Sequence, residues 1–154
     1  MDLEYVSRSP DAVTPLPDLR SRATFRHWTH IPVRYSDLDP IGHVNNTGLP
    51  MFFEEARLHL IYPILNASSR KGLELVLVRT VIEYLKEIGY PDTVEIGTVI
   101  ARLGSKSFDM AHGVFNGRGE CVGIGECTMV VFDQLARIST VPPEDVRQAL
   151  LDLR

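Results

Sequence analysis

The sequence predicts an α+β domain in which an antiparallel β-sheet packs against one long helix. Three observations support this class. Residues 49–65 carry apolar side chains at helical spacing, the segments after residue 72 are strand-like, and Asn116-Gly117-Arg118-Gly119 between two of them is typical of a β-hairpin turn. The order of one strand, one long helix and four strands implies an α+β domain.

The first predicted strand lies within residues 23–35, which are rich in aromatic and β-branched side chains. Phe25, Ile31, Val33 and Tyr35 share one parity, so we expect these four side chains to cover one buried face. A polar turn then leads into the helix.

The predicted helix spans residues 49–65 and has a broad apolar face. Pro50 suits its first turn, whereas Pro63 should end or kink it, because proline lacks the N–H that the helix needs. Three charged side chains are expected largely on the side away from the apolar face: Glu54, Glu55 and Arg57.

Four strands and a short helix are predicted after the long helix. Residues 73–86 are apolar on both parities, so we expect this strand to be buried on both faces. Residues 93–103 alternate in polarity, and residues 107–115 and 121–132 flank the hairpin turn. The pattern of residues 144–153 indicates an amphipathic helix.

Length and composition restrict the function classes. A chain of 154 residues fits one domain, which we place at residues 23–154, after a proline-containing N-terminal arm at residues 1–22. A net charge of −4 argues against a dedicated nucleic-acid binder. No apolar run approaches the roughly 20 residues that span a bilayer, and the N-terminus does not read as a signal peptide. We therefore expect a cytoplasmic protein without a membrane span.

Most of the candidate chemistry lies between the first strand and the helix. Residues 37–46 read D-L-D-P-I-G-H-V-N-N and bring two carboxylates, a histidine, a glycine and two amides together. One interpretation is purely structural: Asp39 opens a turn, Gly42 supplies an unusual backbone dihedral, and Asn45 or Asn46 caps the helix.

Two catalytic or binding alternatives fit less well. Asp37, Asp39 and His43 offer metal-binding side chains, but Ile41 stands at the third ligand position of a calcium loop and no nearby cluster completes a shell. The D-x-D pair suggests an aspartyl phosphate, yet that chemistry calls for an α/β fold and a longer chain. We therefore expect no metal and no cofactor.

Thioester hydrolysis fits this stretch better. A thioester carbonyl needs a nucleophile or base at its carbon and hydrogen-bond donors at its oxygen. Asp39 can supply the first, and free N–H groups at the helix N-terminus can supply the second. His43 could assist Asp39, and Gly42 would let the backbone approach the substrate closely.

The same residues resemble the motif of hotdog-fold thioesterases of the 4-hydroxybenzoyl-CoA thioesterase group. That motif is roughly D-x-D-x-x-G-H-V-N-N, followed by F-E-x-A-R in the helix, which here is F-E-E-A-R at residues 53–57. A weaker resemblance extends across residues 75–133. The resemblance implies a hotdog fold, with the sheet wrapped around one central helix, and the hydrolysis of acyl-CoA to a carboxylic acid and CoA.

The resemblance also assigns roles to individual residues. It makes Asp39 the catalytic carboxylate and the backbone N–H of Asn46 the donor to the thioester carbonyl. Plant acyl-ACP thioesterases use Asp, Asn and His together, and this sequence matches them at Asp39 and His43 but has Ile41 at the Asn position.

Further substrate contacts are expected outside these three residues. Gly42 and Asn45 belong to the same turn, and the resemblance places the region of Lys106 and Ser107 near CoA. Arg79 is a charge inside an apolar strand, which either pairs with a carboxylate or meets the substrate.

The resemblance implies a homodimer or homotetramer whose sheets join edge to edge, with active sites between subunits. An alternative function is a module that binds acyl-CoA or an acyl carrier without cleaving it. Ile41 and Pro50, which depart from the catalytic patterns, favour that alternative.

Overall fold

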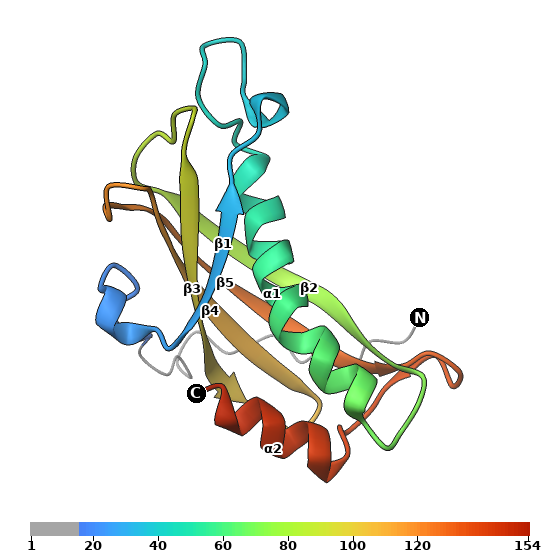
Figure 1. Ribbon diagram of the computed structural model, residues 1–154. Helices are drawn as coiled ribbons and strands as arrows, with labels where there is room; N and C mark the ends of the chain where they lie inside the picture. Colours follow the sequence, from blue (N-terminus) through green and yellow to red (C-terminus); the bar gives the residue numbers. More distant parts are fainter. Residues whose placement is uncertain (1–15) are drawn as a thin grey trace.

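The computed structural model describes residues 16–154 and contains one antiparallel sheet with a long helix across one face (Figure 1). The strand order is β1-β3-β4-β5-β2, and the two-residue strand β6 pairs with β5. This is the hotdog arrangement. The elements are β1 (His27–Pro32), α1 (Gly48–Ala67), β2 (Leu73–Tyr84), β3 (Thr93–Leu103), β4 (Ser107–Phe115), β5 (Cys121–Asp133), β6 (Ile138–Ser139) and α2 (Glu144–Asp152).

Helix α1 lies very close to strand β5, because two glycines of β5 leave room for it. A Cβ atom on Gly125 would stand 2.6 Å from the ring of Phe53, and one on Gly123 would stand 2.5 Å from the side chain of Leu49. Phe53 and Leu49 are both buried as a result. The core therefore sits between the inner face of the sheet and the apolar side of α1.

The structure corrects two expectations about α1. The helix neither ends nor breaks at Pro63 and continues to Ala67. Pro63 is exposed, so the hydrogen bond that it cannot make is lost on the solvent side, where water can satisfy the carbonyl. Arg57 does not face solvent with Glu54 and Glu55: it is buried, and only those two glutamates are exposed.

The first strand is shorter than predicted. Ile31 and Val33 are buried as expected, but Tyr35 is 77% exposed. The chain leaves the sheet after Pro32 and forms a 3₁₀ turn at Tyr35–Asp37, which ends the alternation of faces before Tyr35 is reached.

Strand β2 is not buried on both faces. It is an edge strand that pairs with β5 alone, and Leu77, Val81 and Tyr84 are exposed on it. An apolar run on both parities predicts that both faces of the strand are covered. It does not show whether the same chain or a second chain covers them.

Strands β3 and β4 occupy the predicted ranges, and the turn at residues 116–119 joins β4 to β5 as an antiparallel hairpin.

The part of the predicted N-terminal arm at residues 1–15 lies outside the described residues. From its remainder, Leu19 is buried beside Phe25 and Phe115. No helix between residues 16 and 154 has the length and hydrophobicity to cross a membrane.

Candidate functional site

The loop at residues 38–44 is a small hairpin that precedes α1. Leu38 and Val44 form a β-bridge, and the Asp39 N–H donates to the His43 carbonyl over 2.8 Å. Gly42 has a φ of 89°, which an L side chain rarely adopts, so glycine is needed at the hairpin tip. The connection from β1 to α1 projects beyond the strands at the N-terminal end of the helix (Figure 1).

The Asp39 carboxylate is held by its own hairpin. One oxygen, Oδ1, accepts hydrogen bonds from the N–H groups of Ile41, at 3.0 Å, and of His43, at 3.2 Å. The side chain is half-buried, and no cation of residues 16–154 forms an ion pair with it. Asp39 thus has a fixed position while its second oxygen stays available.

Asp37, the other acid of the motif, is in a different position. Its carboxylate pairs with the Arg34 guanidinium at 2.8 and 3.0 Å and also accepts the Arg34 N–H at 2.8 Å. Burial acts to raise the pKa of Asp37, but these hydrogen bonds from Arg34 outweigh it and lower the pKa below its ordinary value. The Asp37 carbonyl also accepts the N–H of Asn45, so Asp37 stabilises the loop.

The ring of His43 points to a second acid. Its Nε2 atom lies 3.4 Å from a carboxylate oxygen of Glu87, whereas its contact with Asp39 is made through its backbone N–H. The expected pairing of the imidazole with the Asp39 carboxylate is therefore absent from the geometry described for residues 16–154.

The start of α1 is fixed by polar contacts around Asn45 and Asn46. The Asn45 side-chain oxygen accepts the Thr47 N–H at 3.0 Å, and the Asn45 carbonyl accepts the Gly48 N–H. The Tyr84 hydroxyl donates to the Asn46 carbonyl over 2.6 Å. Among the described residues the Asn46 N–H has no acceptor. Sequence reasoning missed the part played by Tyr84, because a contact between residues 38 positions apart leaves no local pattern.

The other predicted substrate contacts are not gathered around Asp39 in one chain. The register of β3 with β4 puts Lys106 and Ser107 at the end of the sheet opposite to residues 94 and 114, which belong to the same buried cluster as Leu49 at the start of α1. Ser107 Oγ accepts a hydrogen bond from Arg102. Arg79 lies on the edge strand β2 and forms an ion pair with Glu126 at 2.6 Å.

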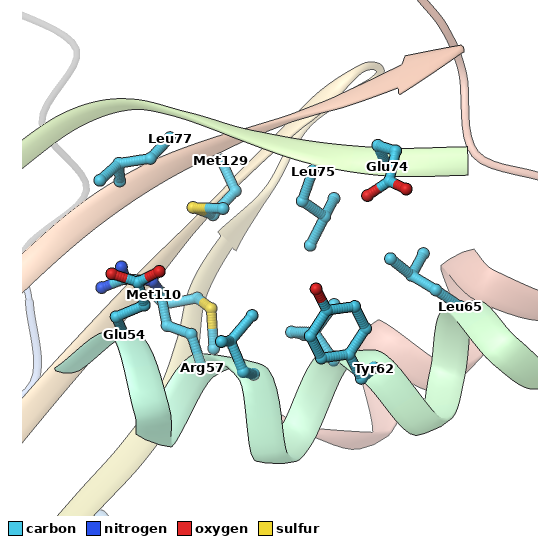
Figure 2. Close-up of a pocket in the computed structure, with 11 residues that line it drawn as sticks. Glu54, Arg57, Tyr62, Leu65, Glu74, Leu75, Leu77, Met110 and Met129 are labelled. Atoms are coloured by element: carbon cyan, nitrogen blue, oxygen red, sulfur yellow. The ribbon is translucent and has the colours of Figure 1, made fainter. Parts of the chain in front are cut away.

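A cavity of about 170 Å³ lies between the middle of α1 and the inner face of the sheet (Figure 2). Asp39 does not line it. Most of its walls are apolar, but Arg57 and Glu54 lie at one end and Tyr62 and Glu74 lie toward the other. The lining residues are Glu54, Arg57, Leu58, Ile61, Tyr62, Leu65, Glu74, Leu75, Leu77, Met110 and Met129. Sequence reasoning did not identify Arg57 as a cavity residue, because its helical position was assigned to the solvent side.

A buried histidine lies on β4, next to Met110 of the cavity. His112 is stacked on Phe53 with ring centroids 5.0 Å apart, and its Nδ1 atom is 3.0 Å from the Thr98 hydroxyl. Burial, reinforced by the positive charge of Arg57, lowers the pKa of His112 to about 3. The imidazole is therefore neutral at physiological pH.

No group of three or more His, Cys, Asp or Glu side chains is arranged to hold a metal ion in the part of the chain that the structure describes. Cys121 and Cys127 are free thiols, and burial raises the pKa of both.

The strand order and the long helix across the sheet are those of the hotdog fold. The chain belongs to the thioesterase-like superfamily, whose family model matches residues 33–150.

Solved structures agree with this family. The PA2801 protein, a proposed thioesterase from Pseudomonas aeruginosa, is 31% identical with a TM-score of 0.73, over 80% of this chain and 97% of that one. A thioesterase from Thermus thermophilus, complexed with coenzyme A and Zn, is 30% identical with a TM-score of 0.72, over 82% and 98%. The PA5185 protein from Pseudomonas aeruginosa, at 24% identity, shows the same fold with a TM-score of 0.79, over 86% of this chain and 94% of that one.

Proposed function

We propose that this protein hydrolyses acyl-CoA thioesters to a carboxylic acid and CoA, with Asp39 as nucleophile or general base. One observation carries the proposal. The Asp39 carboxylate is held by two N–H groups and engaged in no ion pair with the described residues, and it lies seven positions before the Asn46 N–H, which has no acceptor among them. An acid and a free donor are what attack on a thioester carbonyl requires.

The reaction can follow two routes from this arrangement. Asp39 attacks the carbonyl carbon, the C–S bond breaks, CoA leaves as the thiolate, and water then hydrolyses the mixed anhydride. Alternatively, Asp39 takes a proton from a water molecule that attacks the carbonyl directly, the C–S bond breaks, and the CoA thiolate that leaves takes up that proton. In both routes the Asn46 N–H donates to the carbonyl oxygen as negative charge develops on it.

The remaining residues of the hairpin position these groups. The His43 N–H holds Asp39, and the ring of His43 lies against the Glu87 carboxylate on the other side of the loop. Gly42 permits the tight tip, and Asn45 fixes the first turn of α1. We include these residues in the substrate site because each borders either Asp39 or Asn46.

CoA is proposed as the leaving group because the similar Thermus thermophilus thioesterase was solved with coenzyme A. Arg79, Lys106 and Ser107 are proposed contacts for its polar part. They lie away from Asp39 within one chain, so a second subunit must bring them to the site.

We propose a homodimer, formed through β2, as the smallest active unit, with a homotetramer as its doubled form. Strand β2 is an open edge that exposes Leu77, Val81 and Tyr84. Unpaired apolar edges are unfavourable in water, and a two-fold axis would pair this edge with its own copy. We also propose that this assembly is cytoplasmic.

A thioester panel tests the proposal. Purified protein is incubated with aromatic and aliphatic acyl-CoAs, and free CoA thiol is measured, while calorimetry measures binding of each compound. We expect release of CoA from at least one of them at well above the spontaneous rate. Tight binding without any release would instead identify a non-catalytic acyl-CoA module and contradict the proposed hydrolysis.

A further inference from the structure

Pro50 leaves the first turn of α1 one hydrogen bond short. In an α-helix the N–H of residue 50 would donate to the carbonyl of residue 46, four positions earlier, but proline has no N–H. The Asn46 carbonyl therefore lacks its ordinary helical donor. The same residue carries the N–H that we propose as the donor to the thioester carbonyl.

The Tyr84 hydroxyl takes the place of the missing donor. It donates to the Asn46 carbonyl over 2.6 Å, and among residues 16–154 no second donor to that oxygen is in hydrogen-bonding position. Tyr84 is the last residue of β2 and pairs with Gly123 of β5, so its backbone belongs to the sheet. The hydroxyl thus attaches the start of α1 to the sheet at Asn46.

Two contacts fix the direction of the Asn46 N–H. The peptide unit between Asn45 and Asn46 is planar and trans, and its carbonyl accepts the Gly48 N–H at 2.7 Å, so its N–H points away from Gly48. The next peptide unit, between Asn46 and Thr47, is the one that Tyr84 holds. With both units held, the backbone bonds of Asn46 cannot rotate freely, and its N–H keeps one orientation.

Water is a poor substitute for the Tyr84 hydroxyl. Asn46 is exposed, so a water molecule could donate to its carbonyl if the hydroxyl were removed. Such a water does not attach the loop to β2, whereas a donor to a developing negative charge acts through a position that is fixed before the reaction. Removal of the hydroxyl should therefore affect the transition state more than the binding of the CoA part of the substrate.

We propose that Tyr84 is a positioning residue for the reaction and that Pro50 makes the protein depend on it. Tyr84 holds the Asn46 backbone so that the Asn46 N–H meets the thioester carbonyl oxygen. This inference rests on the proposed hydrolase function. Tyr84 acts through Asn46 and takes no part in the covalent steps. Pro50 is exposed, so the dependence can be removed by restoring an N–H at that position without disturbing the core.

A double-mutant cycle tests this role. Hydrolysis of the best acyl-CoA substrate is measured for the wild type, Tyr84→Phe, Pro50→Ala and the double variant. Tyr84→Phe keeps the ring and should lower kcat by roughly tenfold, with KM changed less than about twofold. Alanine at position 50 supplies an N–H to the Asn46 carbonyl, so in the Pro50→Ala background the same Tyr84→Phe change should lower kcat less than about threefold.

Tyr90→Phe is the matched control. Tyr90 is as exposed as Tyr84, at 50%, and its hydroxyl has no hydrogen-bond partner within residues 16–154, so kcat should be unchanged. An unchanged kcat in Tyr84→Phe would overturn the inference. An equal loss of kcat in both backgrounds, or a loss that lower thermal stability explains, would also overturn it, because a merely structural tyrosine gives those results.

Failure of the hydrolase function would be recognised separately, because the wild type would then release CoA from no acyl-CoA. In that case the binding of octanoyl-CoA to the same four proteins is compared by calorimetry. Weaker binding by Tyr84→Phe that the double variant restores supports the positioning of the Asn46 N–H in a non-catalytic protein. Equal affinities, or no binding by any of the four proteins, overturn it.

Discussion

At the scale of single residues, the two acids of the D-x-D motif have different tasks because their partners differ. Asp37 is neutralised by Arg34 and ties the loop to the start of the helix, whereas Asp39 accepts only backbone N–H groups from its own hairpin. A carboxylate in an ion pair is a poor nucleophile and a poor base. The chemistry is therefore assigned to Asp39.

This difference predicts the behaviour of Asp37→Asn. Loss of the ion pair with the largely exposed Arg34 should lower the free energy of unfolding by about 1 kcal/mol, with kcat reduced less than tenfold. Urea unfolding and CoA release measure the two effects. A variant with wild-type stability and a hundredfold lower kcat would show that Asp37, not Asp39, carries out the reaction.

The buried His112 predicts a loss of stability in acid. In the unfolded chain its imidazole takes up a proton as the pH falls through about 6.5, but in the folded protein it does so only near pH 3. The unfolded state binds more protons between these values, so the stabilising contribution is present above pH 6.5 and is lost as the pH falls, by about 1.4 kcal/mol per pH unit.

The measurement compares wild type with His112→Asn by urea unfolding at pH 7.5 and 5.0. The wild type should lose about 2 kcal/mol more than the variant between these values. Parallel pH profiles for the two proteins would contradict a neutral, buried imidazole in the native state.

At the scale of elements, the close contact of α1 with β5 depends on glycine. Gly125 faces the ring of Phe53, and even a methyl group there would overlap it. Overpacking of this kind forces side chains or backbone to shift.

Gly125→Ala should therefore lower the free energy of unfolding by about 1–3 kcal/mol. Gly89→Ala is a matched control, because a Cβ there would meet nothing within 4 Å and its φ is not positive. The control should be neutral or slightly stabilising. Equal stability of the two variants in thermal unfolding would show that α1 does not approach β5 so closely.

Sequence patterns predicted the elements where local chemistry decides the outcome. The ranges of β3 and β4 and the hairpin at residues 116–119 follow from alternation and turn residues. The start of α1 at Gly48 is one residue from the prediction, but the residue before it, Thr47, makes no side-chain capping bond, so the predicted cap by Asn45 or Asn46 is wrong. The errors concern long-range information. The exposure of β2, the burial of Arg57 and the bond from Tyr84 to Asn46 depend on which surfaces meet, and no local period specifies that.

The candidate site was predictable only in part for the same reason. The motif identified Asp39, Gly42 and the helix N-terminus, all within one short segment. It did not predict that the His43 ring would point to Glu87, because Glu87 comes from the chain after β2.

At the scale of the whole molecule, a single chain is incomplete in two respects. The edge of β2 exposes apolar side chains, and the residues proposed to bind CoA lie away from Asp39. Both are resolved if two copies join through β2, since the partner then covers the edge and can contribute to the site.

Val81→Lys tests this assembly. Val81 lies on the exposed edge, and lysine at a sheet edge opposes strand pairing through charge repulsion and hydration. We expect the wild type to sediment as a dimer or tetramer. The dissociation constant of the variant's assembly should be at least tenfold higher than that of the wild type. Leu135→Lys, on the exposed turn before β6, serves as the control and should leave assembly unchanged. A monomeric wild type with full activity would refute the proposed interface.

The most direct test of the central claim is the rate of CoA release by Asp39→Asn on the best acyl-CoA substrate of the wild type. Asparagine keeps an oxygen that can accept the Ile41 and His43 N–H groups, so the hairpin and the thermal stability should be preserved. We predict a fall in kcat of at least about a hundredfold. A folded Asp39→Asn protein that releases CoA at the wild-type rate would contradict the assignment of Asp39 and, with it, the proposed mechanism.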